Sequence, residues 1–283
     1  MRSSSSPDEG DGSPALSVLV PAYDEAATIG QVLASLRELP IEHEVIVVDD
    51  GSNDGTADIV HGHPDVRLVR HEVNQGKGAA IASALAHARA PLVLVQDADL
   101  EYDPVDIPAL LERYRVGDVD AVYGSRNLRP NPRSSRFFFW GGVLLSTLAS
   151  VLYRTRITDE STGYKLVSAD LLRACGLSAR GFDFCAELTG RILRSGGRIA
   201  EVPIGYRPRS SAEGKKIAAR DGLIAAWVLV RERIGPRRLG KLEDLRAAAV
   251  GKHGDALPVG RGRDVLDRPA GPEVLGDTAT RER

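Results

Sequence analysis

Short apolar runs alternate with helical periods from residue 16 to residue 125. The run at 92–95 is apolar at all four positions, which is typical of a strand that a parallel sheet buries on both faces. Between the first two runs, Ile29, Val32 and Leu36 recur at spacings of three and four, as on the buried face of a helix. We therefore predict strand, helix, strand units and a mainly parallel α/β sheet flanked by helices. The predicted strands cover residues 16–20, 44–48, 66–69, 92–95 and 121–123.

The pattern changes after residue 125. An arginine-rich loop leads into an apolar run at 137–153, which Arg154 and Arg156 close. This run is at the lower length limit for crossing a bilayer, and glycine, serine and threonine weaken it, so a span is not favoured. A core helix and a helix lying in a membrane surface both stay open. Further elements are predicted near 184–194, 199–203 and 221–233.

At 283 residues and 42% hydrophobic content, the chain is long enough for one sizeable domain with an extension. Residues 1–14 are polar and lack the apolar segment of a signal peptide, so export is not expected. Residues 236–283 lose periodicity and gain Gly, Pro and charge, and both ends are predicted to be disordered. Cys175 and Cys185 show neither metal-ligand spacing nor a disulfide pattern, which predicts core positions and a cytoplasmic protein.

The net charge of −2 conceals an asymmetry. Residues 1–125 hold 8 Lys and Arg against 22 Asp and Glu, a net of −14, whereas residues 126–283 hold 29 against 17, a net of +12. Cation chemistry is therefore expected in the first half and anion binding in the second. Nucleic acid is not an expected partner, because the positive charge is confined to one part of the chain and has no interleaved aromatics.

Three carboxylates follow the predicted strand at 92–95. Asp97 and Asp99 come first and Glu101 follows, all at the carboxyl edge where open α/β sheets bind ligands. Carboxylates that meet there repel one another unless a cation neutralises them, and hard oxygen ligands favour Mg²⁺ or Mn²⁺ bridged to a substrate diphosphate. We predict a divalent-metal site at these three residues, with an acidic capping turn as the structural alternative.

Four motifs lie at the ends of successive strands, at residues 18–25, 47–56, 74–78 and 97–99. In this order they resemble the nucleotide-sugar half of the family 2 glycosyltransferases, which implies a GT-A (Rossmann-like) fold in a single domain and a donor half at 15–125. Carboxylates in these loops can accept hydrogen bonds from ribose hydroxyls or a base edge. Asp54 is instead expected to form a turn or cap. The donor-binding candidates are Pro21, Tyr23, Glu25, Asp50, Lys77 and Asp97.

Residues 123–126, 159–165, 181–187 and 201–209 resemble a narrower group, the polyprenyl-phosphate glycosyltransferases of the dolichol-phosphate mannosyltransferase type. This resemblance implies an acceptor-binding half at 126–235. It also places Asp159 where other family 2 enzymes have a catalytic base, which makes Asp97, Asp99 and Asp159 the catalytic candidates. The acceptor-phosphate candidates are Arg126, Arg136, Arg209, Lys215 and Lys216.

The expected reaction moves a hexose, mannose or glucose, from a donor such as GDP-mannose or UDP-glucose to a polyprenyl phosphate with inversion. Mg²⁺ or Mn²⁺ would stabilise the leaving diphosphate. A phosphate acceptor already carries an anionic oxygen and needs no general base, whereas a sugar hydroxyl would need one, and Asp159 is the candidate. The arginine-flanked run at 137–153 would give peripheral contact with the cytoplasmic face of a membrane.

Two other interpretations stay open. The same fold can glycosylate a soluble saccharide or natural product, which is favoured if 137–153 is fully buried. A non-catalytic partner subunit that binds sugar nucleotides is the other, and the intact metal motif argues against it. The sequence has no Walker pattern, which disfavours an ATPase, and Val20-Pro21-Ala22 is not the glycine-rich loop of a sugar nucleotidyltransferase.

Overall fold

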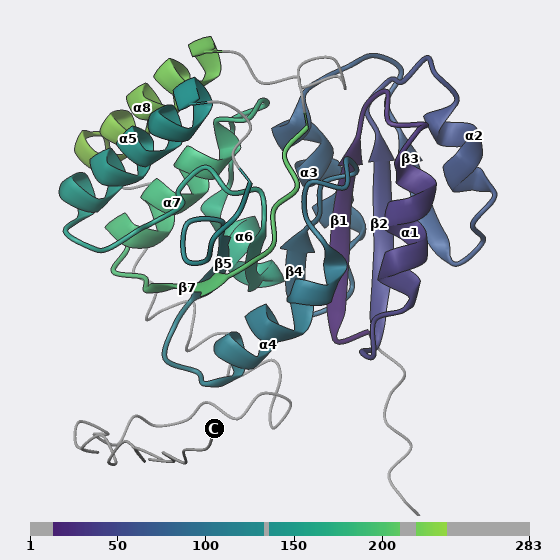
Figure 1. Cartoon of the computed structure of the whole chain (residues 1–283), viewed down its shortest axis with the longest axis horizontal. Helices are drawn as coiled ribbons and strands as arrows, with labels where there is room; N and C mark the ends of the chain where they lie inside the picture. The colour runs from purple at the N-terminus through teal and green to yellow at the C-terminus, as the bar shows by residue number, and fades with distance from the viewer. Residues whose placement is uncertain (1–13, 133–135, 210–218, 237–283) are drawn as a thin grey trace, which may run out of the picture.

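The centre of the protein is a seven-stranded sheet with the order β3-β2-β1-β4-β6-β5-β7 (Figure 1). The structure is a computed structural model that describes residues 14–132, 136–209 and 219–236. Within these residues β6 pairs antiparallel with β4 and β5, and the other pairings are parallel, as predicted. The predicted disordered ends lie almost entirely outside the described residues. The strands are β1 (Leu16–Ala22), β2 (His43–Asp49), β3 (Val66–Arg70), β4 (Leu92–Val95), β5 (Ala121–Ser125), β6 (Lys165–Ser168) and β7 (Ile199–Pro203).

The sequence pattern does not predict β6. This strand begins with Lys165, whose side chain is buried; its ammonium donates to the Glu160 carbonyl at 2.8 Å and lies 3.5 Å from the centre of the Tyr123 ring. These contacts come from tertiary packing, which periodicity cannot reveal. Because β6 lies between β4 and β5, the predicted donor and acceptor halves share one sheet.

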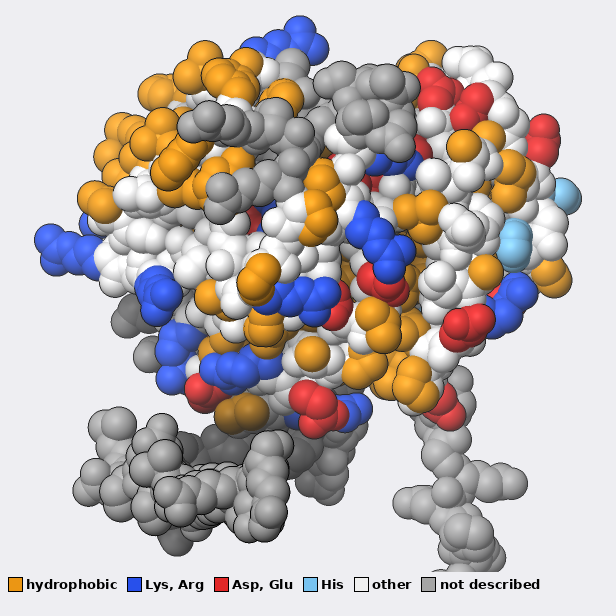
Figure 2. Space-filling model, viewed as in Figure 1, with side chains coloured by type: hydrophobic (Ala, Val, Ile, Leu, Met, Phe, Trp, Pro, Cys, Tyr) orange, Lys and Arg blue, Asp and Glu red, His pale blue; other side chains and the backbone are white. Residues whose placement is uncertain are grey.

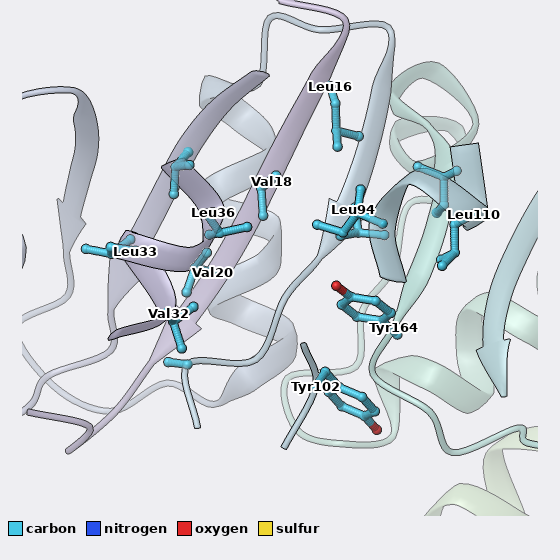
Figure 3. Packing of buried hydrophobic residues seen from close by; sticks show 14 of the residues in the cluster. Leu16, Val18, Val20, Val32, Leu33, Leu36, Leu94, Tyr102, Leu110 and Tyr164 are labelled. Carbon is cyan, nitrogen blue, oxygen red and sulfur yellow. The ribbon is translucent and has the colours of Figure 1, made fainter. Parts of the chain in front are cut away.

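Helices cover both faces of the sheet. On one face, α1, α2 and α4 pack over a cluster that includes Val18, Val20, Leu36 and Leu110 (Figure 3). On the other face, α3, α6 and α7 pack over a second cluster. This three-layer arrangement leaves the carboxyl ends of β1, β2 and β4 together at one edge. The helices are α1 (Ile29–Arg37), α2 (Thr56–His61), α3 (Lys77–His87), η1 (Pro104–Asp106), α4 (Ile107–Arg115), α6 (Ala169–Cys175) and α7 (Phe184–Arg194).

Two further helices, α5 (Arg136–Tyr153) and α8 (Ala219–Ile234), lie side by side and pack against α7 (Figure 1). The run at 137–153 proves to be neither wholly buried nor wholly exposed. Leu145 and Ala149 are buried against Val228 and Leu229 of α8, which gives α5 a core face. In the described part of the chain, no helix combines the length and apolarity that a membrane span requires.

The outer faces of these two helices carry an exposed band of large hydrophobic side chains, which we call the α5–α8 apolar surface (Figure 2). Trp140 is 61% exposed and Leu144 72%, although both belong to the most apolar segment of the chain. Contiguous apolar surfaces of this kind are uncommon on exposed faces and are typical of sites that bind a membrane, another protein or a ligand. Its residues are Phe137, Trp140, Leu144, Val151, Leu223, Ile224, Trp227 and Ile234.

Candidate functional site

The loops that follow β1 and β2 are fastened to each other at the carboxyl edge of the sheet. The N–H of Glu25 donates to Thr56 Oγ1, and the N–H of Ala26 donates to Asp54 Oδ2, both at 2.9 Å. Asp54 Oδ1 also accepts from the N–H of Thr56 at 3.0 Å. Asp54 is therefore a turn residue, as predicted, while the Glu25 side chain remains directed to other partners.

Asp50 is buried and organises the glycine-rich loop after β3. Its Oδ1 accepts from the N–H of Gln75 at 2.9 Å and from His71 Nδ1 at 2.6 Å, and its Oδ2 accepts from the N–H of Gly76 at 2.8 Å. His71 Nε2 lies 2.9 Å from Ser83 Oγ on α3, so a neutral imidazole that donates to Asp50 accepts from this hydroxyl. Asp50, which is predicted to bind the donor, therefore holds the loop that precedes α3 in place.

Lys77 begins α3 and reaches the acidic motif after β4. Its Nζ lies 2.5 Å from Asp97 Oδ1 and 5.6 Å from the centre of the Phe182 ring. Burial opposes the ammonium charge, but the Asp97 carboxylate outweighs it and raises the pKa of Lys77. Two donor-binding candidates from separate motifs therefore meet as a charged pair.

Asp99 and Glu101 flank a strained turn. Leu100 between them has a φ of +61°, a left-handed conformation that leucine rarely adopts and that is often found at functional sites. Burial, together with the neighbouring Asp97 and Glu101 carboxylates, raises the pKa of Asp99 to about 7. The Asp99 carboxylate accepts the N–H of Glu101 at 3.1 Å and, among the described residues, forms no ion pair.

The metal candidates do not form a ready-made cage. Among the described residues, no group of three or more His, Cys, Asp and Glu side chains comes together to hold an ion. Glu101 is engaged elsewhere, because its carboxylate accepts the Tyr206 hydroxyl at 3.1 Å and the N–H of Arg209 at 2.8 Å. Asp99, whose ionisation is disfavoured by burial and by the neighbouring carboxylates, fits a metal better than Asp97, which Lys77 already neutralises.

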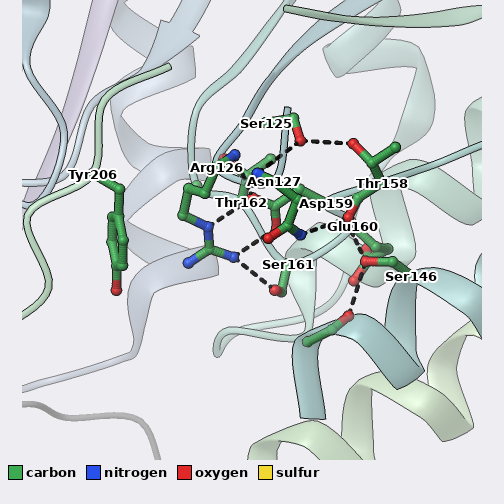
Figure 4. Close-up of polar contacts among 12 residues, drawn as sticks. Ser125, Arg126, Asn127, Ser146, Thr158, Asp159, Glu160, Ser161, Thr162 and Tyr206 are labelled. Atoms are coloured by element: carbon green, nitrogen blue, oxygen red, sulfur yellow. Dashed lines mark hydrogen bonds and ion pairs between the residues drawn. The ribbon is translucent and has the colours of Figure 1, made fainter. Parts of the chain in front are cut away.

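Arg126 follows β5 and is held by Asp159 (Figure 4). Its Nε donates to Asp159 Oδ2 at 2.7 Å and its Nη2 to Oδ1 at 2.6 Å, while the N–H of Arg126 adds a third contact at 2.9 Å. Nη2 also donates to Ser161 Oγ at 2.9 Å, and the guanidinium carbon lies 5.0 Å from the centre of the Tyr206 ring. Asp159 is in turn fixed by its own N–H, which donates to Glu201 at 2.9 Å.

This pairing limits what Asp159 can do. The carboxylate is 1% exposed, and both of its oxygens accept from the same guanidinium. If Asp159 took a proton from an acceptor, its carboxylate would become neutral. The charge of Arg126 would then lose its partner. The arrangement therefore favours Asp159 as an orienting partner of Arg126 over the predicted role of catalytic base.

Arg209 lies at the donor edge and does not line the cavity with Arg126. Its Nη2 donates to Glu25 Oε2 at 2.6 Å and to Thr28 Oγ1 at 3.1 Å, and its Nε donates to the Asp99 carbonyl at 2.8 Å. Burial opposes its charge, but the Glu25 carboxylate and the nearby acidic motif raise the pKa of Arg209. Arg209, which is predicted to bind the acceptor phosphate, is therefore paired with Glu25, a donor-binding candidate.

A cavity of about 1690 Å³ connects these groups to α5 and α8. Its polar end is lined by Lys77, Asp97, Glu101, Arg126 and Asp159. The rest of its lining includes apolar residues of α5 and α8, and Phe137, Trp140, Leu144 and Leu223 among them also belong to the α5–α8 apolar surface. A molecule with an anionic head and an apolar tail matches this polarity.

Apart from Asp50, Arg126, Asp159 and Arg209, which are described above, the predicted site residues divide into three sets. Those brought together at the carboxyl edge include Glu25, Lys77, Asp97, Asp99 and Glu101. Pro21 lies in β1 and Tyr23 just beyond its end, near the same edge. Arg136 is the first residue of α5, and Lys215 and Lys216 lie outside the described residues.

Sequence reasoning missed three residues that shape the site. His71, Glu201 and Tyr206 support Asp50, Asp159 and Glu101 respectively. His71 and Glu201 stand outside or at the margin of the motifs, and each acts through a partner that is distant in sequence. Both cysteines are buried, as predicted, and burial raises the pKa of Cys175 to about 12 and that of Cys185 to about 11.

The chain is similar in sequence to known proteins. The family model Glycosyl transferase family 2 matches residues 17–176. Undecaprenyl-phosphate mannosyltransferase of Micrococcus luteus is 33% identical over 242 residues, which covers 77% of this chain and 98% of that protein.

Two solved structures are similar in fold. Glucosyl-3-phosphoglycerate synthase from Mycobacterium tuberculosis, in complex with Mn²⁺, UDP and phosphoglyceric acid, has a TM-score of 0.59 and 23% identity over 78% of this chain and 79% of that one. A mannosyltransferase from Pyrobaculum calidifontis, in complex with GDP-Man and Mn²⁺, has a TM-score of 0.51 and 22% identity over 85% of this chain and 76% of that one. Because the family model covers more than half of the sequence, and the sheet matches these enzymes, the chain belongs to glycosyltransferase family 2 and has the GT-A fold.

Proposed function

We propose that this glycosyltransferase moves a hexose from a nucleoside-diphosphate sugar to a polyprenyl phosphate, with inversion at the anomeric carbon. The observation that carries the proposal is the cavity, which joins the Lys77–Asp97 and Arg126–Asp159 pairs to an apolar wall made by α5 and α8. A soluble acceptor needs the polar end but has no use for the apolar wall. The 33% identity to undecaprenyl-phosphate mannosyltransferase, over almost the whole of that protein, supports the same acceptor class.

The donor is expected at the carboxyl edge of β1, β2 and β4. Lys77 supplies a cation close to Asp97, where a donor diphosphate would meet it, and the glycine-rich loop allows the backbone to approach. A carboxylate can accept several hydrogen bonds, so Glu25 can accept from the ribose or base while Arg209 holds it in place.

A divalent ion, Mg²⁺ or Mn²⁺, fits this edge, with Asp99 as its main protein ligand and Asp97 or Glu101 assisting. The fit rests on the chemistry of these side chains: Asp99 offers carboxylate oxygens beside Asp97 and Glu101, and burial with these neighbouring carboxylates raises its pKa to about 7. When bound, the ion would neutralise charge on the leaving diphosphate. Oxygen atoms of the donor and water would supply the remaining ligands of such an ion.

Arg126 is the proposed binder of the acceptor phosphate. The Asp159 contacts use its Nε and Nη2 atoms, and a guanidinium has further N–H donors for a second oxyanion. Tyr206 lies against the same guanidinium and restricts its movement. The acceptor phosphate brings its own anionic oxygen, so positioning by Arg126 replaces a general base.

The α5–α8 apolar surface is proposed to seat on the membrane that holds the lipid acceptor. Trp140 of α5 and Trp227 of α8 are both exposed, as aromatics are at membrane interfaces, and Trp140 also lines the cavity. This contact would let a polyprenyl phosphate enter without leaving the bilayer. A protein bound in this way would be a peripheral enzyme at the membrane surface.

The proposal can be tested by comparing acceptors. We expect labelled sugar to pass from the donor to polyprenyl phosphate in the presence of Mn²⁺, with no transfer to polyprenol or to a soluble saccharide. Arg126→Ala should lower acceptor specificity about ten- to a hundredfold, the value of one charge-assisted contact. Arg37→Ala is the matched control, because Arg37 forms a similar two-point pair with Asp65 on the exposed surface. Equal transfer to a soluble saccharide would overturn the lipid assignment.

A further inference from the structure

The motif at 181–187 contains a buried anchor that the proposed reaction does not explain. Glu187 of α7 is 0% exposed. Its Oε2 accepts the N–H groups of Ser178 and Ala179 at 2.8 and 2.7 Å, and its Oε1 accepts Ser178 Oγ at 2.7 Å. Arg191, one helical turn further on, pairs with the same carboxylate. Burial opposes ionisation, but the hydrogen bonds from Ala179 and Ser178, with Arg191, lower the pKa of Glu187, so the anchor is charged.

The turn held by Glu187 supports the loop that carries Lys77. The N–H groups of Gly78 and Ala79 both donate to the Arg180 carbonyl, at 2.7 and 3.3 Å. The two segments are in close contact. A Cβ atom at Gly76 would overlap the Arg180 carbonyl, and a Cβ atom at Gly78 would overlap the Ala179 carbonyl. The start of α3 can therefore take this position only where the turn is fixed.

We infer that Glu187 is a positioning residue for Lys77. The chain of contacts runs from the Glu187 carboxylate through the backbone of residues 178–180 to the N–H of Gly78, and Lys77 precedes that residue. From the other side, Asp50 holds the N–H of Gly76, so two buried carboxylates clamp the loop. One part of this inference rests on the proposed function, namely the contact of Lys77 with the donor diphosphate.

Glu187 also connects this loop to α8. Arg191 Nε lies 3.4 Å from Glu232 of α8, and Arg231 Nη2 lies 3.5 Å from Glu187 Oε1. The Glu232 contact keeps a partner for Arg191 when the Glu187 charge is removed, which favours retention of the fold in Glu187→Gln. The amide introduced by this substitution would present one acceptor atom where the native carboxylate presents two.

The test compares Glu187→Gln with Glu44→Gln. Glu44 is a matched control at the opposite edge of the sheet, because its carboxylate also accepts a serine hydroxyl and two consecutive N–H groups, those of Arg89 and Ala90. We expect Glu187→Gln to speed hydrogen exchange at Gly78 and Ala79 about tenfold and to weaken Mn²⁺-dependent binding of UDP or GDP by a similar factor. Glu44→Gln should change neither, even at an equal loss of thermal stability.

Two outcomes overturn the inference: unchanged exchange at Gly78 and Ala79 in Glu187→Gln, or the same acceleration in Glu44→Gln. If Glu187→Gln fails to fold, Ser178→Ala carries the test, because it removes one contact to Glu187 and should produce a smaller change of the same sign. No acceleration in that variant would also overturn it. The exchange measurement is made on the free protein, so it stands even if wild type binds no nucleotide and the proposed function fails.

Discussion

Replacing Asp99 by asparagine should stabilise the free protein and remove its response to metal. Burial raises the pKa of Asp99 from 3.8 to about 7, so the folded state resists ionisation that the unfolded chain undergoes freely. The resulting penalty is absent below about pH 4, grows as the pH rises to about 7, and is constant above that. Three pH units correspond to about 4 kcal/mol at most, and partial exposure of the side chain reduces this to about 2 kcal/mol. The asparagine side chain cannot ionise, and it can still accept the N–H of Glu101.

The assay is urea unfolding with chelator present, followed by tryptophan fluorescence, at several pH values. We expect the Asp99→Asn variant to gain about 2 kcal/mol over wild type near pH 8 and almost nothing near pH 4. With Mn²⁺ and UDP or GDP at about 100 times the dissociation constant, wild type should gain about 2.7 kcal/mol and the variant little. Turnover should fall on the order of 10²–10³-fold or more. A variant that binds Mn²⁺ and nucleotide as wild type does would refute the metal assignment.

Three further outcomes are expected. Arg209→Ala should weaken nucleotide-sugar binding about tenfold in calorimetry, because the guanidinium holds Glu25 at the donor edge; an effect confined to acceptor kinetics would restore the predicted acceptor role. His71→Ala should raise the donor dissociation constant with little effect on acceptor KM, measured in the same assays, since His71 supports Asp50; unchanged donor affinity would contradict this. Replacing both Trp140 and Trp227 by serine should abolish flotation with anionic vesicles, which salt should also weaken in wild type; flotation equal to that of wild type would count against the membrane surface.

Elements with a strong local pattern could be predicted from the sequence. The strand at 92–95 and the elements near 184–194 and 199–203 are found at the predicted positions, because a continuous apolar run or a regular period reports burial directly. The convergence of Lys77 and Asp97 also followed, since parallel strands end at one edge.

Partners that are distant in sequence could not be predicted. Arg209 is 184 residues from Glu25, and the sequence around either residue does not predict their contact. The strand that begins at Lys165 was not predicted, because a lysine is not expected in a buried strand. In the fold, a carbonyl and an aromatic ring stabilise its charge. Asp159 matched a position associated with a catalytic base, and its bond with Arg126 became visible only in three dimensions.

The most direct test of the account is to identify the product of wild-type enzyme incubated with nucleotide sugar, Mn²⁺ and polyprenyl phosphate. We predict a lipid-linked hexosyl phosphate, with one sugar per phosphate and an anomeric configuration, determined by NMR, opposite to that of the donor. The account would be contradicted by a product whose sugar is attached to a hydroxyl of a soluble acceptor while polyprenyl phosphate stays unmodified.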